Sequence, residues 1–390
     1  MRMDARDHKG KIFGLYPNGD MESIIGVVSG HYRISALPGT RDIPGMLEIL
    51  AESGNAPELS STVTFTANKR TKLYAVPSDC NMFVHRFPDG TMPPEEYDSE
   101  WSGKTLIDTV TNGMELEHVK FIATYDMLPR AGLGGSGCLA ACIVRASLNI
   151  RYNISSENAL NLDALDRYPA VREIFEKGRD FRDLGAAHLA AKLENESYRT
   201  GCLDAVSSLP TGNVNHFEFH DDHLPDVKHI PEVAHHINYR MMICLVGKLH
   251  DSVKLNDGKL YDVRARPKEW RRDIEDTSKY AELIHDLENW HEIVGFLREV
   301  YDRRVFAYEA AGTTYETPAQ KRIADFVYER GGAVRGMGAG GTVCGAFFLD
   351  YDDLLEAYER FGHDNDVKIL DIKIREDSNH YTHQKLSNNL

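Results

Sequence analysis

A glycine-rich segment at residues 129–137 has the residue types of a phosphate-binding loop. It follows an apolar, strand-like run at 119–125 and precedes an apolar, helix-like run at 138–149. Its sequence is Pro129-Arg130-Ala131-Gly132-Leu133-Gly134-Gly135-Ser136-Gly137. A loop that opens a helix presents unpaired backbone N–H groups and the positive end of the helix dipole to an anion. We therefore predict that this loop binds phosphate groups, with a plain strand-to-helix turn as the alternative for the loop taken alone.

The hydroxyl group of Ser136 adds a candidate metal ligand to this loop. A hydroxyl oxygen is a hard ligand, which suits Mg²⁺ held between two phosphate groups. The loop is not a Walker A motif, because no lysine follows the glycines, and it does not lie in the first strand-helix-strand unit as a dinucleotide fingerprint would. The predicted chemistry is therefore nucleotide-phosphate binding by another type of loop.

The elements predicted around these residues mix strands and helices along the whole chain. Alternating and β-branched residues predict strands, and apolar residues three or four apart predict helices. The predicted strands are 24–28, 32–37, a strand pair within 61–76, 119–125, a strand within 207–219, 239–246 and a glycine-rich pair within 333–349. The predicted helices are 44–52, a buried helix at 138–149, an insertion without a motif at 153–181, 184–196, a long region at 277–310, and 320–330. We therefore expect a mixed α+β fold.

Length and charge limit the classes of protein to consider. A chain of 390 residues usually exceeds one hydrophobic core, so we predict two domains, 1–228 and 229–390. The 45 basic and 60 acidic side chains give a formal net charge of -15, which argues against binding to nucleic acid or anionic membranes. The N-terminus carries no apolar signal segment, and no run reaches the ~18 apolar residues of a membrane-spanning helix. We expect a cytoplasmic protein.

The glycine-rich loop resembles the central motif of the GHMP-type kinases, a family named after galactokinase, homoserine kinase, mevalonate kinase and phosphomevalonate kinase. That motif runs Pro, two or three residues, then Gly-Leu-Gly-Ser-Ser-Ala. In this chain Gly135 replaces the first Ser and Gly137 replaces the Ala. Ser136 falls on the position that ligates magnesium in the family.

Three further segments resemble motifs of the same family and follow its order along the chain. Residues 33–44 are similar to the first motif of the heptose-phosphate kinase branch, with Pro38 and Thr40 where that branch usually has glycine. Residues 201–208 are similar to the stretch whose aspartate faces the substrate hydroxyl group. Residues 335–345 are similar to the C-terminal glycine-rich loop, although such a loop can also be a simple turn. Chance agreement of four ordered segments is improbable.

The resemblance implies a site for ATP and Mg²⁺. The residues expected to bind ATP are Pro129, Gly132, Leu133, Gly134, Gly135, Ser136, Gly137, Gly338, Gly340 and Gly341. Ser136 and Glu194 are expected to hold Mg²⁺, with Glu196 as the alternative if the register slips. Asp204 is expected to take the proton of the substrate hydroxyl group or to orient that group. Taken alone, Glu194 would be a solvated helix residue and Asp204 an ordinary loop carboxylate.

Several charged residues are candidates for substrate contacts and catalysis. We hypothesise that Arg33 lies near Asp204, where its charge would keep the carboxylate ionised and balance developing charge; the alternative is a surface ion pair. By resemblance to sugar-binding relatives, Asp42 would accept a hydrogen bond from a substrate hydroxyl group, or it stabilises a turn before Pro44. Arg41 and Lys72 could meet an anionic substrate, although solvated charges on a strand are commoner.

The resemblance further implies a ribosomal S5 domain 2-like N-terminal domain and a ferredoxin-like C-terminal domain, with the active site in the cleft between them. The expected activity is phosphorylation of a hydroxyl group of a small anionic metabolite by ATP. A sugar or sugar phosphate resembling heptose 7-phosphate is the first choice of substrate. A mevalonate-type acid, including mevalonate 3-phosphate phosphorylated at its 5-hydroxyl group, is the alternative. The expected partners are this substrate and ATP, with a homodimer as the possible assembly.

Two other classes of protein remain open. A metal-dependent hydrolase could use Asp221 and Asp222 with a histidine-rich segment, although its spacing fits no familiar metal signature. The histidines of that segment are His216, His220, His223, His229, His235 and His236. A binding protein that keeps a kinase fold without catalysis is the third class.

Overall fold

The computed structural model describes most of the chain. The described residues are 5–6, 12–15, 21–24, 26–37, 45–58, 60–79, 81–86, 103–114, 116, 118–127, 133–152, 182–197, 202–209, 212–219, 225–247, 252–310, 315–337 and 342–376. The chain forms two compact units, one from Met1–Tyr32, Lys69–Pro129 and Gly134–Pro210, and the other from Arg33–Asn68, Arg130–Leu133 and Thr211–Leu390. The units interleave along the sequence, whereas the predicted domains 1–228 and 229–390 are consecutive; that domain division stays a prediction.

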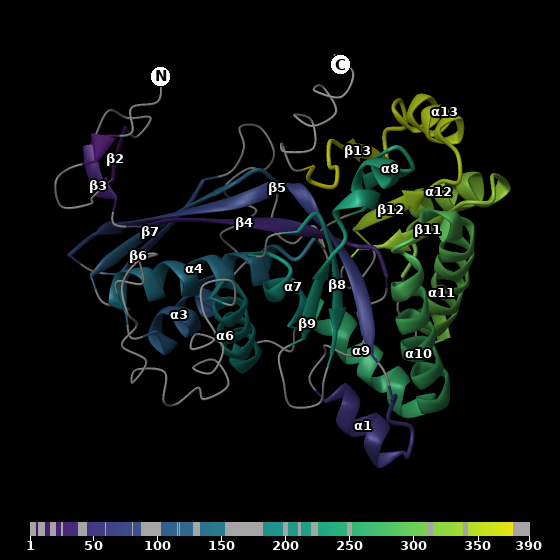
Figure 1. Ribbon diagram of the computed structural model, residues 1–390, viewed down its shortest axis with the longest axis horizontal. Helices are drawn as coiled ribbons and strands as arrows, with labels where there is room; N and C mark the ends of the chain where they lie inside the picture. The colour runs from purple at the N-terminus through teal and green to yellow at the C-terminus, as the bar shows by residue number, and fades with distance from the viewer. Residues whose placement is uncertain are drawn as a thin grey trace, which may run out of the picture. The chain divides into compact units, whose positions relative to one another are not determined.

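The first unit combines strands with a group of packed helices. Its strands are β1 (Ala5–Arg6), β2 (Ile12–Leu15), β3 (Met21–Ile24), most of β4 (Gly26–Ser35), the second half of β5 (Ser61–Pro77), β6 (Met82–Arg86) and β7 (Val119–Tyr125). Strands β1, β2 and β3 pair antiparallel, while β7 lies antiparallel to β5 and parallel to β6. Helices α3 (Gly103–Gly113), α4 (Gly135–Tyr152) and α6 (Arg182–Ser197) lie along one side of these strands (Figure 1).

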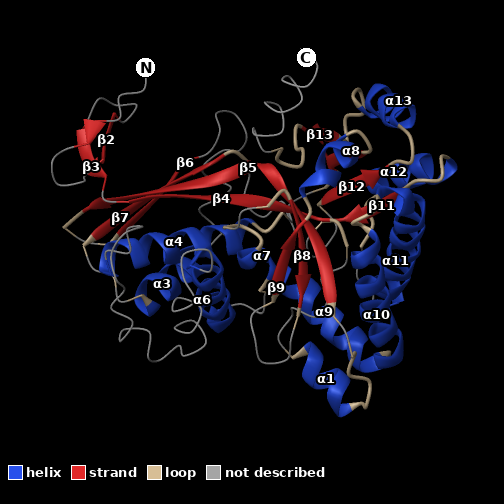
Figure 2. Ribbon diagram, in the orientation of Figure 1, coloured by secondary structure: helices blue, strands red, loops and turns tan. Residues whose placement is uncertain are grey.

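The second unit contains an antiparallel sheet with helices around it. The sheet has the order β11 (Ala333–Gly336), β12 (Val343–Phe347), β10 (Met241–Leu245) and β13 (Lys368–Leu370). Strand β8 (Val214–Glu218) pairs with the first half of β5 and with β9 (Asp226–His229). The helical elements are α1 (Met46–Glu52), the 3-10 turn Pro231–Val233, α8 (Ala234–Asn238), α9 (Ser252–Ala265), α10 (Pro267–Leu283), the 3-10 turn Leu287–Asn289, α11 (Trp290–Ala310), α12 (Pro318–Glu329) and α13 (Tyr351–Phe361). Figure 2 shows this mixture of helices and strands.

Three predictions differ from the structure in their number of segments. The two strands expected at 24–28 and 32–37 form one continuous strand, β4. Residues 61–76 were expected to form a strand pair, but β5 is one strand, because its two halves pair with different neighbours, β8 and β7. The helical region expected over 277–310 is divided between α10 and α11. The division follows from Asp286, whose side chain accepts a hydrogen bond from the N–H of Glu288 at 3.0 Å and starts a separate 3-10 turn.

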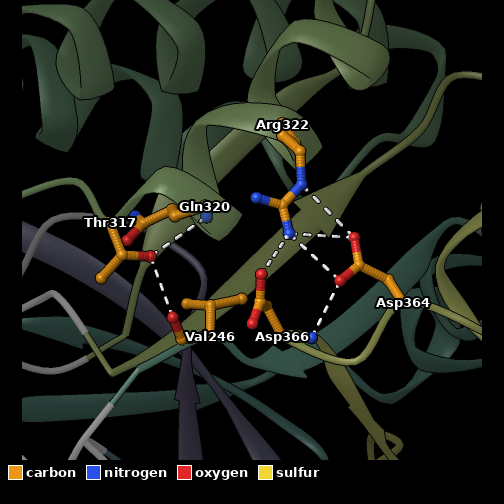
Figure 3. A network of polar contacts seen from close by, with 6 residues as sticks. All are labelled: Val246, Thr317, Gln320, Arg322, Asp364 and Asp366. Atoms are coloured by element: carbon orange, nitrogen blue, oxygen red, sulfur yellow. Dashed lines mark hydrogen bonds and ion pairs between the residues drawn. The ribbon is translucent and has the colours of Figure 1, made fainter.

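Polar contacts in the second unit fix the start of α12. The hydroxyl group of Thr317 accepts a hydrogen bond from the N–H of Gln320 at 3.1 Å and donates one to the carbonyl group of Val246 at 2.9 Å (Figure 3). The hydroxyl group therefore satisfies one of the first free N–H groups of the helix and ties the helix to the end of β10. Further along α12, Arg322 binds the carboxylates of Asp364 and Asp366.

Candidate active site

The glycine-rich loop continues directly into α4. The helix begins at Gly135, three residues before the predicted start, so Gly135, Ser136 and Gly137 form its first turn. Gly134 has a φ of 74°, which strongly favours glycine. The N–H groups of a first helical turn lack partners within the helix and carry the positive end of the dipole. The start of α4 can therefore bind an anion.

Helix α4 is held in place by burial and by strand β4. Every residue from Gly137 to Val144 is buried, which confirms the predicted buried helix. Strand β4 crosses the helix at Gly30, where a Cβ atom would lie 2.8 Å from the sulfur atoms of both Cys138 and Cys142. The close crossing of backbone and helix therefore requires glycine on the strand.

Asp204 lies against the first turn of α4. It occupies the first turn of the short helix α7 (Leu203–Val206) and is partly buried. A Cβ atom added to Gly137 would lie 2.6 Å from Cβ of Asp204 and 2.8 Å from the backbone nitrogen of Ala205. These distances are shorter than any ordinary contact, so the two backbones touch across a glycine. The structure thus brings together the predicted phosphate loop and the predicted catalytic carboxylate.

Strand β4 also supports the end of α7. The N–H of His31 donates a hydrogen bond to the carbonyl group of Ser208 at 2.8 Å. Gly30 contacts α4, and His31 bonds the chain just after α7. Two neighbouring residues of one strand therefore help to position the two helices that meet at Gly137 and Asp204. The sequence did not single out Gly30 or His31, because their role depends on which helices pack against the strand.

Glu194 occupies a third element of this region. It lies on α6 and its side chain is fully buried, and α6 packs against both α4 and α7. A buried carboxylate needs a compensating charge or hydrogen bonds, and carboxylate and hydroxyl oxygens are the ligands that Mg²⁺ prefers. Ser136, partly exposed, and Glu194 therefore fit a magnesium site by their donor types. The alternative residue Glu196 lies on the same helix.

Arg33 and Lys72 are both described, in different units. The N–H of Arg33 donates to the carbonyl group of Leu133 at 3.0 Å, which connects β4 to the glycine-rich loop. Arg33 as a whole residue is 8% exposed, and its guanidinium group donates a hydrogen bond to Ser35. Its predicted proximity to Asp204 stays a prediction. Lys72 lies on β5 opposite Thr124 and is partly buried.

Several candidate residues fall outside the part of the chain that the structure describes. They are Pro129, Gly132, Gly338, Gly340, Gly341, Arg41 and Asp42. The glycine-rich strand pair expected around 333–349 is present as β11 and β12. The expected insertion at 153–181 also lies outside the described residues.

The structure adds two arginines that the sequence did not single out for chemistry. Arg304 is 7% exposed and its guanidinium carbon lies 3.8 Å from the ring centre of Trp270. The pKa of Arg335 is lowered to about 10, chiefly by burial and also by the charges of Arg304 and Arg33, while Tyr315 acts in the opposite direction. The second unit therefore gathers positive charge beside the start of the segment 335–345.

The described histidines of the segment 216–236 do not gather at one place. His229 on β9 hydrogen-bonds Asn215, and His235 and His236 lie on α8. His216 on β8 instead contacts His285 and Glu282, which lie outside that segment. Burial lowers the pKa of His216. His220, His223, Asp221 and Asp222 fall outside the described residues.

The sequence matches no protein-family model and no curated protein sequence. Solved structures do match. Mevalonate kinase of L. major in complex with R-mevalonate superposes with a TM-score of 0.56 at 10% identity, over 90% of this chain and 96% of that chain. This chain has the fold of the GHMP-type kinases.

Two further matches extend the range of proteins that share the GHMP kinase fold. D-glycero-D-manno-heptose 1-phosphate kinase of Bacteriodes thetaiotaomicron has a TM-score of 0.51 at 13% identity, over 90% of this chain and 96% of that chain. Mevalonate pyrophosphate decarboxylase of Streptococcus pyogenes has a TM-score of 0.56 at 14% identity, over 91% of this chain and 98% of that chain. The predicted α+β GHMP kinase fold is confirmed, while the S5-like and ferredoxin-like domain assignments stay predictions.

The described part of the chain contains no helix that is both long and apolar enough to cross a bilayer. The expected cytoplasmic location and the homodimer stay predictions.

Proposed function

We propose that this chain is an ATP- and Mg²⁺-dependent kinase that phosphorylates a hydroxyl group of a small anionic metabolite. The contact of Gly137 with Asp204 carries this proposal, because it sets a carboxylate directly beside a helix start that can bind phosphate. The fold supports it, since proteins that share the fold include kinases of small molecules. Phosphoryl transfer needs positioned phosphates, neutralised charge and an acceptor for the proton of the alcohol.

Each requirement has a candidate group in the first unit. The N–H groups of the first turn of α4, from Gly135 to Gly137, bind the terminal phosphates of ATP. Ser136 and Glu194 hold Mg²⁺, which when bound neutralises charge on the β and γ phosphates. Asp204 orients the substrate hydroxyl group and accepts its proton as the new bond to phosphorus forms.

The substrate is expected to be anionic. The second unit carries positive charge on the buried Arg33 and Arg304 and on the partly buried Arg335, and Arg33 also bonds the glycine-rich loop through its backbone. Arg41 and Asp42 are proposed to contribute a positive charge and a hydroxyl contact. A sugar phosphate resembling heptose 7-phosphate is the first choice, and a mevalonate-type acid, including mevalonate 3-phosphate, is the alternative. Proteins named for each class share the fold.

A substrate panel tests both the reaction and its acceptor. The full chain is incubated with ATP, Mg²⁺ and one sugar phosphate or mevalonate derivative at a time, and release of ADP is measured. The variant Asp204→Asn keeps the shape of the side chain and removes the proton acceptor. The matched control is Asp352→Asn, because Asp352 also lies in the first turn of a helix, α13, but is exposed to solvent.

The expected result is substrate-dependent release of ADP with one member of the panel. Asp204→Asn should lower kcat by roughly 10²- to 10⁴-fold, the usual contribution of a positioned acid or base, whereas Asp352→Asn should leave it unchanged. Full turnover by Asp204→Asn would remove Asp204 from the mechanism. Absence of ADP release across the panel, with ATP bound or not, would contradict the kinase proposal itself.

A further inference from the structure

A group of metal-ligating side chains lies in the second unit, where β8 meets the end of α10. His216 projects from β8 and is fully buried. Glu282 lies in the last turn of α10, and His285 follows two residues after that helix ends. The N–H of His285 still bonds the carbonyl group of Glu282 at 3.4 Å, so the helical turn continues through both residues. Residues three apart in a helical turn lie on the same face.

The three side chains converge to within the dimensions of a coordination shell. Nδ1 of His216 lies 3.0 Å from Nε2 of His285, and Nε2 of His216 lies 3.7 Å from Oε1 of Glu282. One ligand atom from each of the three residues can be chosen so that all lie within 4.8 Å of one another. Two ligand atoms on a tetrahedral Zn²⁺ ion are separated by about 3.3 Å, given a Zn–N distance of about 2.05 Å.

A second observation distinguishes this group from an ordinary hydrogen-bonded histidine pair. Nε2 of His216 is buried and makes no hydrogen bond to the described part of the protein. The 3.7 Å to Glu282 is too long for a hydrogen bond. A buried polar atom without a hydrogen bond is costly, and such atoms need an explanation. A ligand held between the imidazole and the carboxylate would supply it.

We propose that His216, Glu282 and His285 form a binding site for a transition-metal ion of the Zn²⁺ class. Two imidazole nitrogens and one carboxylate oxygen are typical ligands of zinc and of its neighbours in the first transition row. Mg²⁺ prefers oxygen ligands throughout, so this site is distinct in chemistry from the one proposed at Ser136 and Glu194. The inference does not depend on the kinase proposal.

Binding requires a small movement of one ring and gives the site a structural consequence. When His216 binds the ion through Nε2, its proton stays on Nδ1, so the ring of His285, whose Nε2 lies 3.0 Å from that nitrogen, must turn to offer a free nitrogen to the ion. The bound ion would join β8 to α10. A second link in the same region, from the N–H of Ser61 on β5 to the hydroxyl group of Ser278 on α10 at 2.8 Å, shows that this helix is already fastened to the strands.

Zinc binding tests the proposal on the full, untagged chain. The chain is stripped with a chelator and titrated with Zn²⁺ against a chromophoric competitor, and Co²⁺ is used as a spectroscopic probe. His285→Ala and Glu282→Gln remove exposed ligands and spare the buried His216, so both variants should fold. The matched control is His235→Ala, since His235 forms a comparable exposed pair with Glu376 at 3.3 Å but has no third ligand beside it among the described residues.

The expected result is one equivalent of Zn²⁺ per chain, visible absorption bands of tetrahedral Co²⁺, and a rise of Tm with zinc concentration. His285→Ala and Glu282→Gln should each weaken zinc binding at least about tenfold, whereas His235→Ala should bind as the wild type does. The proposal is overturned if the stripped chain takes up no Zn²⁺, or if either ligand variant binds as tightly as the wild type. Kinase activity is not a readout, so failure here leaves the proposed function standing.

Discussion

Gly137→Ala is the substitution that tests the proposed site most directly, because the new methyl group would clash with α7. Its Cβ atom would lie 2.6 Å from Cβ of Asp204, 2.8 Å from the nitrogen of Ala205 and 2.9 Å from the carbonyl carbon of Asp204. Two of these neighbours are backbone atoms, which cannot rotate away as the end of a long side chain can. The start of α4 and α7 must therefore move apart.

The displacement and its cost follow from these distances. Ordinary contact begins at 3.4 Å, so the closest pair must separate by 3.4 − 2.6, about 0.8 Å. A misplacement of about 1 Å between reacting groups costs about 10²-fold in rate, or about 2.7 kcal/mol in the barrier. The same overpacking costs about 1–3 kcal/mol of stability, partly offset by the better helix propensity of Ala. Because domains are stable by about 5–15 kcal/mol, the variant should still fold.

The assay is steady-state release of ADP with the substrate found in the panel, together with urea unfolding of the same samples. The matched control is Gly295→Ala in α11, where a Cβ atom meets nothing within 4 Å. The control should keep full activity and gain up to about 1 kcal/mol of stability. If Gly137→Ala kept wild-type kcat, or gained stability as the control does, the close contact of Gly137 with Asp204 would not be required for activity or for packing.

Three further perturbations act on other parts of the molecule. Thr317→Ala should lower the free energy of unfolding by about 1 kcal/mol in urea titrations, because the bonds to Gln320 and Val246 are lost, and Thr317→Ser should restore most of it; an equal loss in both variants would argue against the cap. Burial lowers the pKa of His188 from its usual value to about 4. Below about pH 6.5 the unfolded chain therefore binds a proton that the folded chain does not, and the free energy of unfolding falls by at most about 3 kcal/mol as the pH drops toward 4. Urea unfolding at several pH values should show a smaller fall in the free energy of unfolding for His188→Gln than for the wild type. An unchanged pH dependence in this variant would show that His188 is not its cause. Glu194→Gln should raise the Mg²⁺ concentration needed for half-maximal ADP release by at least about tenfold while ATP binding without metal is retained; an unchanged Mg²⁺ requirement would exclude Glu194 as a ligand.

The parts of the fold that depend on local sequence were predicted well. The buried helix α4 was predictable because apolar residues cover nearly all of its faces. Strand β5 was not predicted as a single strand, since the choice between a hairpin and one long strand depends on its distant partners β7 and β8. Propensity contains no information about which strand lies on either side.

The candidate sites also differ in how far their residues could be predicted from local sequence. The glycines and Ser136 could be proposed from the sequence because a loop at a helix start is local, whereas the packing of Gly137 against Asp204 joins residues 67 positions apart. His216 was noticed among neighbouring histidines, but its contacts in the structure are Glu282 and His285. No local pattern connects a strand to the end of a helix so far along the chain.

The departure of this chain from the motif it resembles has a physical explanation in the packing of α7. Where the GHMP motif ends in Ala, this chain has Gly137, and the structure leaves no space there for a methyl group. Gly30 on β4 meets a similar condition against α4, where a Cβ atom would lie 2.8 Å from the sulfur atoms of Cys138 and Cys142. The first turns of α4 therefore make close contacts with both α7 and β4. Since the next residue, His31, bonds the chain after α7, the position of Asp204 relative to the loop depends on β4 as much as on the loop itself.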